Sequence, residues 1–430
     1  MTLGDLQPRV SSPPPGPRSR ELSLRLRELE APGVNTLPPG DEAASLLWEE
    51  ARGANVRDVD GNIYLDLTAG FGVAAVGHAH PRVVAAVREQ AGILLHGLGD
   101  VHAHPLRVAL AERLVRIAPV DDPQVFFSIS GAEAVEIALK TAVAATGRPG
   151  VLAFEPAYHG MTLGALAVTS RAEFRAPFAA HLHGHVYRLR FGCDPDRIAA
   201  VLGRGDIGGV LVEPVVGREG VLLPPPGWLA ALAAACRGHG VPLIADEIFT
   251  GFGRTGTLFA VEAEGVRPDL LCCGKALGGG LPIAAVLGRR ALFRCWETAG
   301  EARHTATFLA NPPACAAALA VLDILEEDRL PARAAALGPR VGERLAGLLR
   351  HAPAVTAVRG RGLLWGIELA TAGLAKAWVA AARDRGVLFL AGGPAGRVAQ
   401  VVPPLTIGEA QLDAALGILE ETLEEALAPA

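Results

Sequence analysis

The fold is decided by the stretch Asp269-Leu270-Leu271-Cys272-Cys273-Gly274-Lys275-Ala276-Leu277-Gly278-Gly279-Gly280-Leu281-Pro282. Its apolar first half predicts a buried strand, and the turn after that strand carries Lys275 into a glycine triplet. Lys275 therefore lies where a charge is costly. Only three of the 40 basic residues are lysines: Lys140, Lys275 and Lys376. Because a desolvated lysine can lose its proton and form an imine, whereas arginine stays protonated, arginine could not replace Lys275 in that role.

A reactive amine is not the only role that this stretch allows for Lys275. It could be a surface lysine beside a flexible loop, or the lysine of a phosphate-binding P-loop. A P-loop has Ser or Thr directly after its lysine, whereas Ala276 follows here. The choice between a surface lysine and a reactive one depends on residues earlier in the chain.

The composition excludes several classes of protein. Charges interrupt every apolar run before the roughly 18 residues that a membrane span needs. The net charge of −5, with arginines scattered among acids, gives no basic surface for nucleic acid. The six cysteines form no C-x-x-C pair and predict buried thiols in a reducing cytoplasm. His78, His80 and the group His181, His183 and His185 lack further ligands at metal-binding spacing, so we expect no metal site.

The order of apolar runs predicts the domain organisation. Strands and helices alternate, which favours an α/β fold: a large domain with a mostly parallel sheet covered by helices, plus a smaller α+β domain. The Pro-rich start predicts a disordered segment 1–20. We expect 21–67 to join the small domain, 68–311 to form the large domain and 312–430 the small one. Strands of the large sheet are expected at 125–127, 151–154, 210–212, 241–245, 270–273 and 283–287.

Polar side chains follow the ends of five of these strands. Because ligands bind beyond the carboxyl ends of parallel strands, we expect these residues to converge at one edge: Ser128, Ser130, Glu155, Tyr158, Glu213, Asp246, Glu247 and Lys275. The run from Ser130 into a helix is either a simple helix cap or a phosphate cup of free backbone N–H groups. A buried Asp246 needs a cationic partner, such as a pyridinium nitrogen. With Lys275 for an imine and Tyr158 for stacking, this set predicts a pyridoxal 5'-phosphate (PLP) site.

Two stretches carry a family resemblance. Ala245-Asp246-Glu247-Ile248-Phe249-Thr250-Gly251-Phe252-Gly253-Arg254-Thr255-Gly256 and Gly274-Lys275-Ala276-Leu277-Gly278-Gly279-Gly280 resemble the signature of class III aminotransferases, the ornithine and 4-aminobutyrate aminotransferase family. The resemblance runs from about Leu46 to Ile407. It implies the PLP-dependent transferase fold of type I.

The resemblance also implies a role for each matching residue. Lys275 would hold PLP as an imine and move the proton during catalysis, and Asp246 would pair with the ring nitrogen. Tyr158 and Ile248 would pack on the two ring faces, with His159 beside Tyr158. Glu213 would lie near the cofactor and substrate, unless it only caps the turn after its strand. Ser130, Gly131 and Ala132 would hold the phosphate, joined by Thr307 of a neighbouring subunit, which implies a homodimer with shared sites.

The departures from the family pattern fall on the substrate side. Gln400 stands where the family has an arginine for an α-carboxylate, and Met161 stands where 4-aminobutyrate enzymes have another. Arg218, in contrast, replaces a family glutamate. We expect Arg218, aided by Gln400, to take over the carboxylate, unless it is a solvent-facing arginine paired with Glu219. Phe71 is expected to make the pocket more apolar.

The predicted function is a PLP-dependent aminotransferase that moves an amino group from an amino acid or amine to a 2-oxo acid by a ping-pong mechanism. Relatives on the same cofactor include racemases, aminomutases and a decarboxylase, and these outcomes remain open. A non-catalytic protein on the same fold would have no reason to keep a costly buried charge at Asp246 and Lys275.

Overall fold

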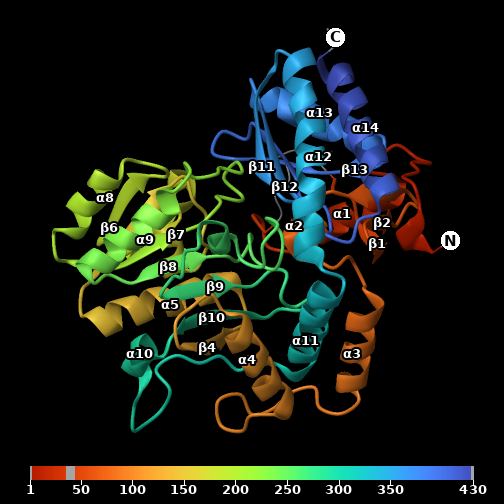
Figure 1. Cartoon of the computed structure of the whole chain (residues 1–430). Helices are drawn as coiled ribbons and strands as arrows, with labels where there is room; N and C mark the ends of the chain where they lie inside the picture. The colour runs from red at the N-terminus through yellow and green to blue at the C-terminus, as the bar shows by residue number, and fades with distance from the viewer. Residues whose placement is uncertain (1, 35–43, 428–430) are drawn as a thin grey trace.

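The computed structural model describes residues 2–34 and 44–427. Its centre is a seven-stranded sheet in the order β4-β10-β9-β8-β7-β5-β6 (Figure 1), in which β10 alone runs antiparallel to both of its neighbours. Two four-stranded sheets accompany it, β1-β2-β3-β13 and β11-β12-β15-β14. The strands are β1 Trp48–Arg52, β2 Asn55–Asp58, β3 Ile63–Asp66, β4 Pro123–Ser128, β5 Gly150–Glu155, β6 Val186–Arg190, β7 Ile207–Val212, β8 Leu243–Asp246, β9 Leu270–Cys273, β10 Ala284–Arg289, β11 Val355–Arg361, β12 Leu364–Leu369, β13 Val387–Leu388, β14 Leu390–Gly392 and β15 Val398–Val401.

Helices cover both faces of the large sheet, as predicted. Alternate residues of each strand point to opposite faces, so Leu271 and Cys273 join one buried cluster while Leu270 and Cys272 join another. The first cluster includes side chains of α4, α8, α9 and α11, and the second those of α5 and α6. The helices are α1 Pro17–Leu29, α2 Ala69–Gly72, α3 Pro81–Ala91, α4 Pro105–Ile117, α5 Gly131–Thr146, α6 Leu163–Val168, α7 Ala172–Arg175, α8 Pro195–Leu202, α9 Trp228–His239, α10 Arg290–Phe293, α11 Pro312–Glu327, α12 Leu330–His351, α13 Ala372–Asp384 and α14 Glu409–Leu427.

The two-face burial explains which strands the sequence reveals. A strand covered on both sides is a continuous apolar run, and all six predicted runs correspond to strands of the large sheet. The edge strand β6 was missed because charged and apolar residues mix along it. Since β10 reverses direction on both sides, β4 points the same way as β9. The carboxyl ends of β4, β5, β7, β8 and β9 therefore meet at one edge.

The N-terminal prediction of disorder is wrong for residues 2–20. Arg9 pairs with Ile63, and the backbone N–H groups of Ser11 and Ser12 donate to Asn62 Oδ1. Helix α1 starts at Pro17, and Asp60 accepts hydrogen bonds from its first turn. The Pro-rich segment has no core of its own, but the polar side chains of the β2–β3 turn hold it in place.

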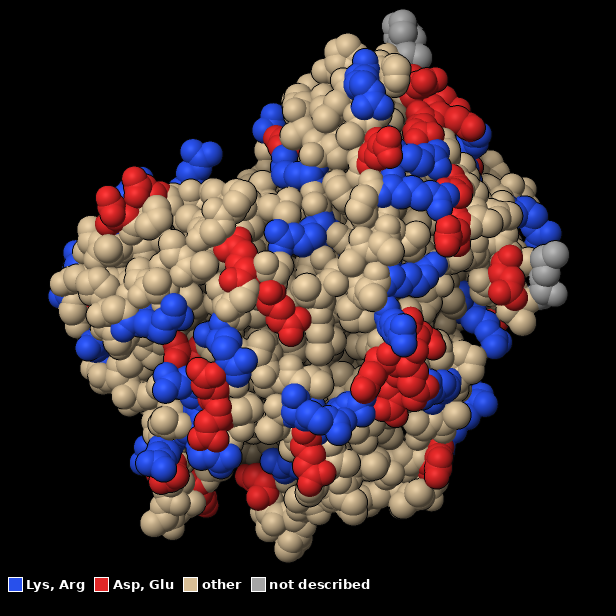
Figure 2. Space-filling model, in the orientation of Figure 1, with Lys and Arg blue, Asp and Glu red and all other residues tan. Residues whose placement is uncertain are grey.

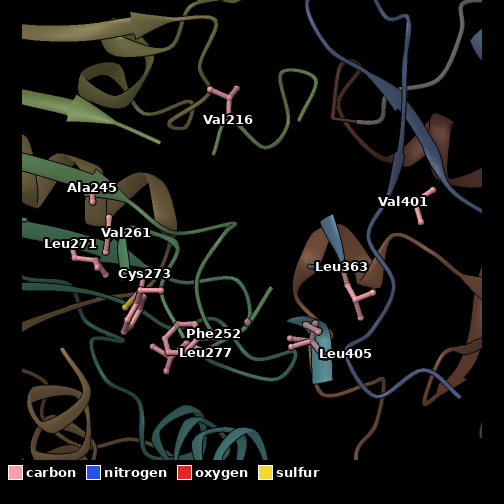
Figure 3. Close-up of a cluster of buried hydrophobic side chains, with 14 of the residues drawn as sticks. Val216, Ala245, Phe252, Val261, Leu271, Cys273, Leu277, Leu363, Val401 and Leu405 are labelled. Atoms are coloured by element: carbon pink, nitrogen blue, oxygen red, sulfur yellow. The ribbon is translucent and has the colours of Figure 1, made fainter. Parts of the chain in front are cut away.

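One hydrophobic core joins the large sheet to the four-stranded sheet β11-β12-β15-β14. Figure 3 shows Ala245 and Leu271 of the large sheet in the same cluster as Val401 of β15 and Leu405 beyond it. Segment 48–66 adds to the small-domain side, because β3 pairs in parallel with β13. Helix α11 contacts α3 and α4 of the large domain, and the domain boundaries at 68 and 312 stay predictions.

On the face drawn in Figure 2, Lys and Arg lie among Asp and Glu, so this face has no extended surface of one charge. In residues 2–34 and 44–427, no helix combines the length and apolar content needed to traverse a lipid bilayer. Five of the six cysteines are buried, and all six are free thiols.

Candidate active site

A cavity of about 500 Å³ opens at the carboxyl edge of the large sheet. The predicted residues that line it are Ser130, Gly131, Ala132, Tyr158, His159, Glu213, Arg218, Asp246, Ile248 and Lys275. They come from the ends of β4, β5, β7, β8 and β9, so the shared strand direction brings together residues up to 145 positions apart in the sequence. Of the residues expected to converge at the strand ends, Ser130, Tyr158, Glu213, Asp246 and Lys275 line this cavity.

The N-terminus of α5 forms one wall of the cavity. Ser130 caps the helix, with its hydroxyl oxygen accepting from the Glu133 N–H at 3.2 Å. The first N–H groups of a helix have no intrahelical acceptor, and the helix dipole favours an anion there. A Cβ added at Gly131 would lie 2.9 Å from Ile248 Cγ2, so glycine is needed for this close packing. The arrangement fits a phosphate at Ser130, Gly131 and Ala132.

Asp246 lines the cavity and is almost completely buried. Its Oδ2 is 2.7 Å from His159 Nδ1, and its Oδ1 accepts from the Ile248 N–H at 3.1 Å. His159 Nε2 is buried and has no hydrogen-bond partner in the part of the chain that the structure describes. A buried carboxylate beside an imidazole can stabilise a cationic ring nitrogen.

Lys275 also faces the cavity. Burial, together with a smaller effect of Arg218, lowers the pKa of its amine to about 8, while Asp246 and Glu213 oppose the shift. Its Nζ lies 4.0 Å from the centre of the Phe249 ring. For a lysine the neutral, nucleophilic form is therefore accessible near neutral pH.

Glu213 holds two backbone segments together. Its Oε1 accepts from the Tyr158 N–H and its Oε2 from the Gly217 N–H, both at 2.9 Å. Burial and the nearby Asp246 raise the pKa of Glu213, while His159 opposes the rise. The carboxylate thus caps the turn after its strand and also fixes the backbone of Tyr158.

Arg218 stacks on Tyr158, with its guanidinium carbon 4.1 Å from the ring centre. The alternative prediction, in which Arg218 pairs with Glu219, is wrong. The buried Glu219 carboxylate instead binds Arg171, whose Nε lies 2.8 and 3.0 Å from the two oxygens. Nothing in the sequence marks Arg171, because it lies 48 positions before its partner.

Some predicted residues do not reach the cavity of their own chain. Phe71 is 68% exposed, and Val73 lines the cavity in its place. The side-chain amide of Gln400 donates hydrogen bonds to the carbonyl oxygens of Gly217 and Arg218, at 3.3 and 2.9 Å. Thr307 is exposed.

Three other residues expected to converge at this edge, Ser128, Glu155 and Glu247, do not line the cavity. Glu155 lies 3.2 Å from Arg188, and Glu247 accepts from the Val261 N–H. Within the described residues, no group of three or more His, Cys, Asp or Glu side chains is arranged to bind a metal.

The sequence matches the family described as aminotransferase class-III over residues 36–423. The chain belongs to the class III aminotransferases. The acetylornithine aminotransferase of Methanothermobacter thermautotrophicus is 38% identical over 382 residues, which cover 88% of this chain and 94% of that relative.

Solved structures agree with this class III aminotransferase in fold. The ornithine aminotransferase of Toxoplasma gondii superposes with a TM-score of 0.87 at 28% identity, covering 95% of each chain. An amine transaminase from an uncultivated Pseudomonas species, solved in its PLP-bound form, gives a TM-score of 0.85 at 30% identity, covering 92% of this chain and 98% of that one. The PLP-dependent transferase fold of type I, predicted from the sequence, is confirmed.

The cavity of this class III aminotransferase fits PLP on its own geometry. It offers an anion cup at α5, a buried Asp246–His159 pair and a lysine with a lowered pKa. Sequence reasoning missed some apolar lining residues, Val73 and Ile283 among them. Their types are common in any core, and only the fold turns them toward the cavity.

Proposed function

We propose that this chain is a PLP-dependent aminotransferase that moves an amino group from a donor to a 2-oxo acid in two half-reactions. The observation that carries the proposal is the convergence of Lys275, the Asp246–His159 pair and the N-terminus of α5 in one cavity. Each element alone could serve the fold only. Together they match the charges of a phosphorylated pyridine aldehyde.

Each residue has a distinct role in this proposal. Ser130, Gly131 and Ala132 hold the phosphate, and Asp246, oriented by His159, keeps the ring nitrogen protonated. Tyr158 and Ile248 confine the two ring faces. All of these residues line the same cavity, which supports the assignments.

When bound, PLP supplies an electron sink for the electrons of a broken C–H bond. The Lys275 amine takes the proton from the amino-bearing carbon of the donor, since a pKa of about 8 suits a base near neutral pH. The Phe249 ring, 4.0 Å from the amine, keeps water away from that side of it. Glu213 acts as a positioning residue, because it fixes the backbone of Tyr158 and Gly217.

We also propose that the enzyme is a homodimer. An apolar face is formed by Ile93, Leu95, Leu98, Val101 and Phe308, each more than half exposed. The Asn311 side chain binds the Leu95 carbonyl, and Phe308 packs on His96, so the two segments of this face lie together. A second copy would cover such a face. Thr307, beside Phe308, would then reach the phosphate of the partner's site.

The unpaired state of all six cysteines supports a cytoplasmic location. The function is tested by incubating holoenzyme with amino donors in the absence of any acceptor. An aminotransferase releases one equivalent of oxo product per site, whereas a racemase converts the donor into its mirror image without consuming it. Neither product from any donor, with PLP bound, would contradict the proposal.

A further inference from the structure

Arg218 is a cation in the catalytic cavity with no carboxylate partner among the described residues. It is the one arginine of the described chain that lines the cavity. Its neighbour Glu219 is occupied by Arg171, and no described acidic side chain lies within ion-pair distance of Arg218. The rings of Tyr158 and Phe174 lie against it, at 4.1 and 5.6 Å. Stacking fixes the plane of a guanidinium and leaves its N–H edge available.

The turn that carries Arg218 is fastened from several sides. Val216 and Leu222 pair across its base. Gln400 donates to the Arg218 carbonyl at 2.9 Å, and the Gly393 N–H donates to the same oxygen at 3.3 Å. Because the backbone is held at both ends, the side chain can be aimed with little loss of entropy on binding.

The buried Arg171–Glu219 pair fixes the same turn from the other side. Arg171 also donates to the Gly393 carbonyl at 3.0 Å, so a single arginine links the turn to the end of β14. Arg359 of β11 completes the anchorage with hydrogen bonds to the carbonyls of Gly220 and Val221. Both domains therefore meet at the Arg218 turn.

Apart from Arg218, Glu213 and the residues assigned to PLP, the cavity is lined by apolar side chains and glycines. Val73, Met161, Phe249 and Leu281 line the cavity together with Arg218 and Lys275. Arg218 is also near enough to Lys275 to lower the pKa of its amine. One carboxylate can therefore be matched by Arg218 while the remainder of a donor meets hydrocarbon.

We propose that Arg218 anchors the carboxylate of the amino donor, and that the Arg171–Glu219 pair and Gln400 position it. The donor class is then the amino acids with one carboxylate and an apolar side chain. This inference rests on the aminotransferase function proposed above. In this inference Gln400 binds the backbone of the Arg218 turn and does not contact the substrate.

The test compares two donors that differ only at the carboxylate, 2-aminobutyrate and sec-butylamine, in single-turnover reactions of the holoenzyme. We expect Arg218→Ala to lower the second-order rate constant for 2-aminobutyrate by about 30- to 100-fold. The rate constant of Arg218→Ala for sec-butylamine stays within about threefold of the wild-type value. Arg218→Lys restores part of the rate constant for 2-aminobutyrate. An equal effect on both donors, or none on 2-aminobutyrate, would overturn the inference.

Calorimetry separates failure of the inference from failure of the function. Isovalerate has no amino group, so its binding to the PLP-loaded protein does not depend on turnover. We expect Arg218→Ala to weaken isovalerate binding at least 10-fold and to leave neutral isovaleramide unaffected. If Arg218→Ala binds isovalerate as tightly as the wild type, the anchoring role of Arg218 is refuted even if the enzyme is active. If the variant loses isovalerate binding but the wild-type protein shows no turnover, only the aminotransferase function is refuted.

Glu219→Gln tests the positioning role. We expect the apparent dissociation constant of 2-aminobutyrate to rise about 10-fold, with its limiting rate constant within about twofold of wild type. Glu155→Gln, which loses a half-exposed carboxylate outside the cavity, serves as the matched control and changes neither value. A limiting rate that falls for both donors alike would make Glu219 merely structural and contradict this part.

Discussion

Lys275 Nζ lies 4.0 Å from the centre of the Phe249 ring, so the amine meets an aromatic face within the cavity that both residues line. The ring is wedged between two glycines. A Cβ added at Gly72 would lie 2.6 Å from it, and one added at Gly217 only 2.1 Å. Phe249 therefore connects the backbone that carries Arg218 to the amine that performs the chemistry.

This wedge predicts the effect of Gly217→Ala. The new methyl group must displace the ring, because its three nearest atoms all belong to Phe249, and overpacking of this kind costs about 1–3 kcal/mol. We expect lower stability in urea and slower oxo-product release. Gly238→Ala in α9, where an added Cβ meets no atom within 4 Å, is the control. Equal stabilities of the two variants would show that Phe249 is not confined.

The pKa of Lys275 predicts a pH-dependent stability of the protein without PLP. The folded-state pKa is about 8 and the ordinary value is 10.5, so between these values the unfolded chain binds more protons. Folding stability therefore rises with pH across this window. Lys275→Met removes the cost of the buried charge, and we expect it to stabilise the chain by about 3 kcal/mol at pH 7. Urea titrations should show the difference shrinking from pH 8 to 10.5; a constant difference would contradict the assignment.

Asp246 and Glu247 provide an adjacent pair of buried carboxylates for comparison. Asp246 lines the cavity, whereas Glu247 accepts from the Val261 N–H outside it. We expect Asp246→Ala to slow oxo-product release about 100-fold or more, because the charge opposite the ring nitrogen is lost. Glu247→Gln should stay within about threefold. Similar losses in both variants, at matched PLP occupancy, would remove the special role of Asp246.

The apolar face predicts the assembly state. We expect the wild-type chain to sediment as a dimer, and Ile93→Glu with Phe308→Glu to shift it to a monomer that binds PLP more weakly. Leu29→Glu, at an 82% exposed position on α1, should leave the dimer intact. A wild-type monomer with full PLP affinity would contradict both the dimer and the shared role of Thr307.

The sequence predicts the strands that are buried on both faces, because such strands are continuous apolar runs. β9 was predicted at its observed bounds because it is apolar on both faces. β6 and β15 were missed, since neither is a continuous apolar run. The order of residues 2–20 was missed for another reason. It depends on hydrogen bonds to Asn62 and Asp60, and partners so distant leave no local pattern.

For the site, the sequence predicts which residues come together but not which contacts they make. Residues directly after strands, such as Glu213 and Lys275, were predicted to meet because the strand direction fixes their positions. Their contacts were not: the Asp246–His159 hydrogen bond spans 87 positions, and Arg171–Glu219 spans 48. Which neighbour a side chain selects depends on packing, and for Arg218 the adjacent Glu219 was the wrong candidate.

The central claim is that Lys275 is the lysine that binds PLP. Sodium borohydride reduction of the holoenzyme followed by peptide mass spectrometry tests it directly, since reduction makes the attachment permanent. The chain offers its own controls in Lys140, which lies 3.1 Å from His304 Nδ1, and Lys376 on α13. We predict the pyridoxyl mass on Lys275 alone. A label on Lys140 or Lys376, or an unlabelled Lys275 in a PLP-loaded protein, would contradict this claim.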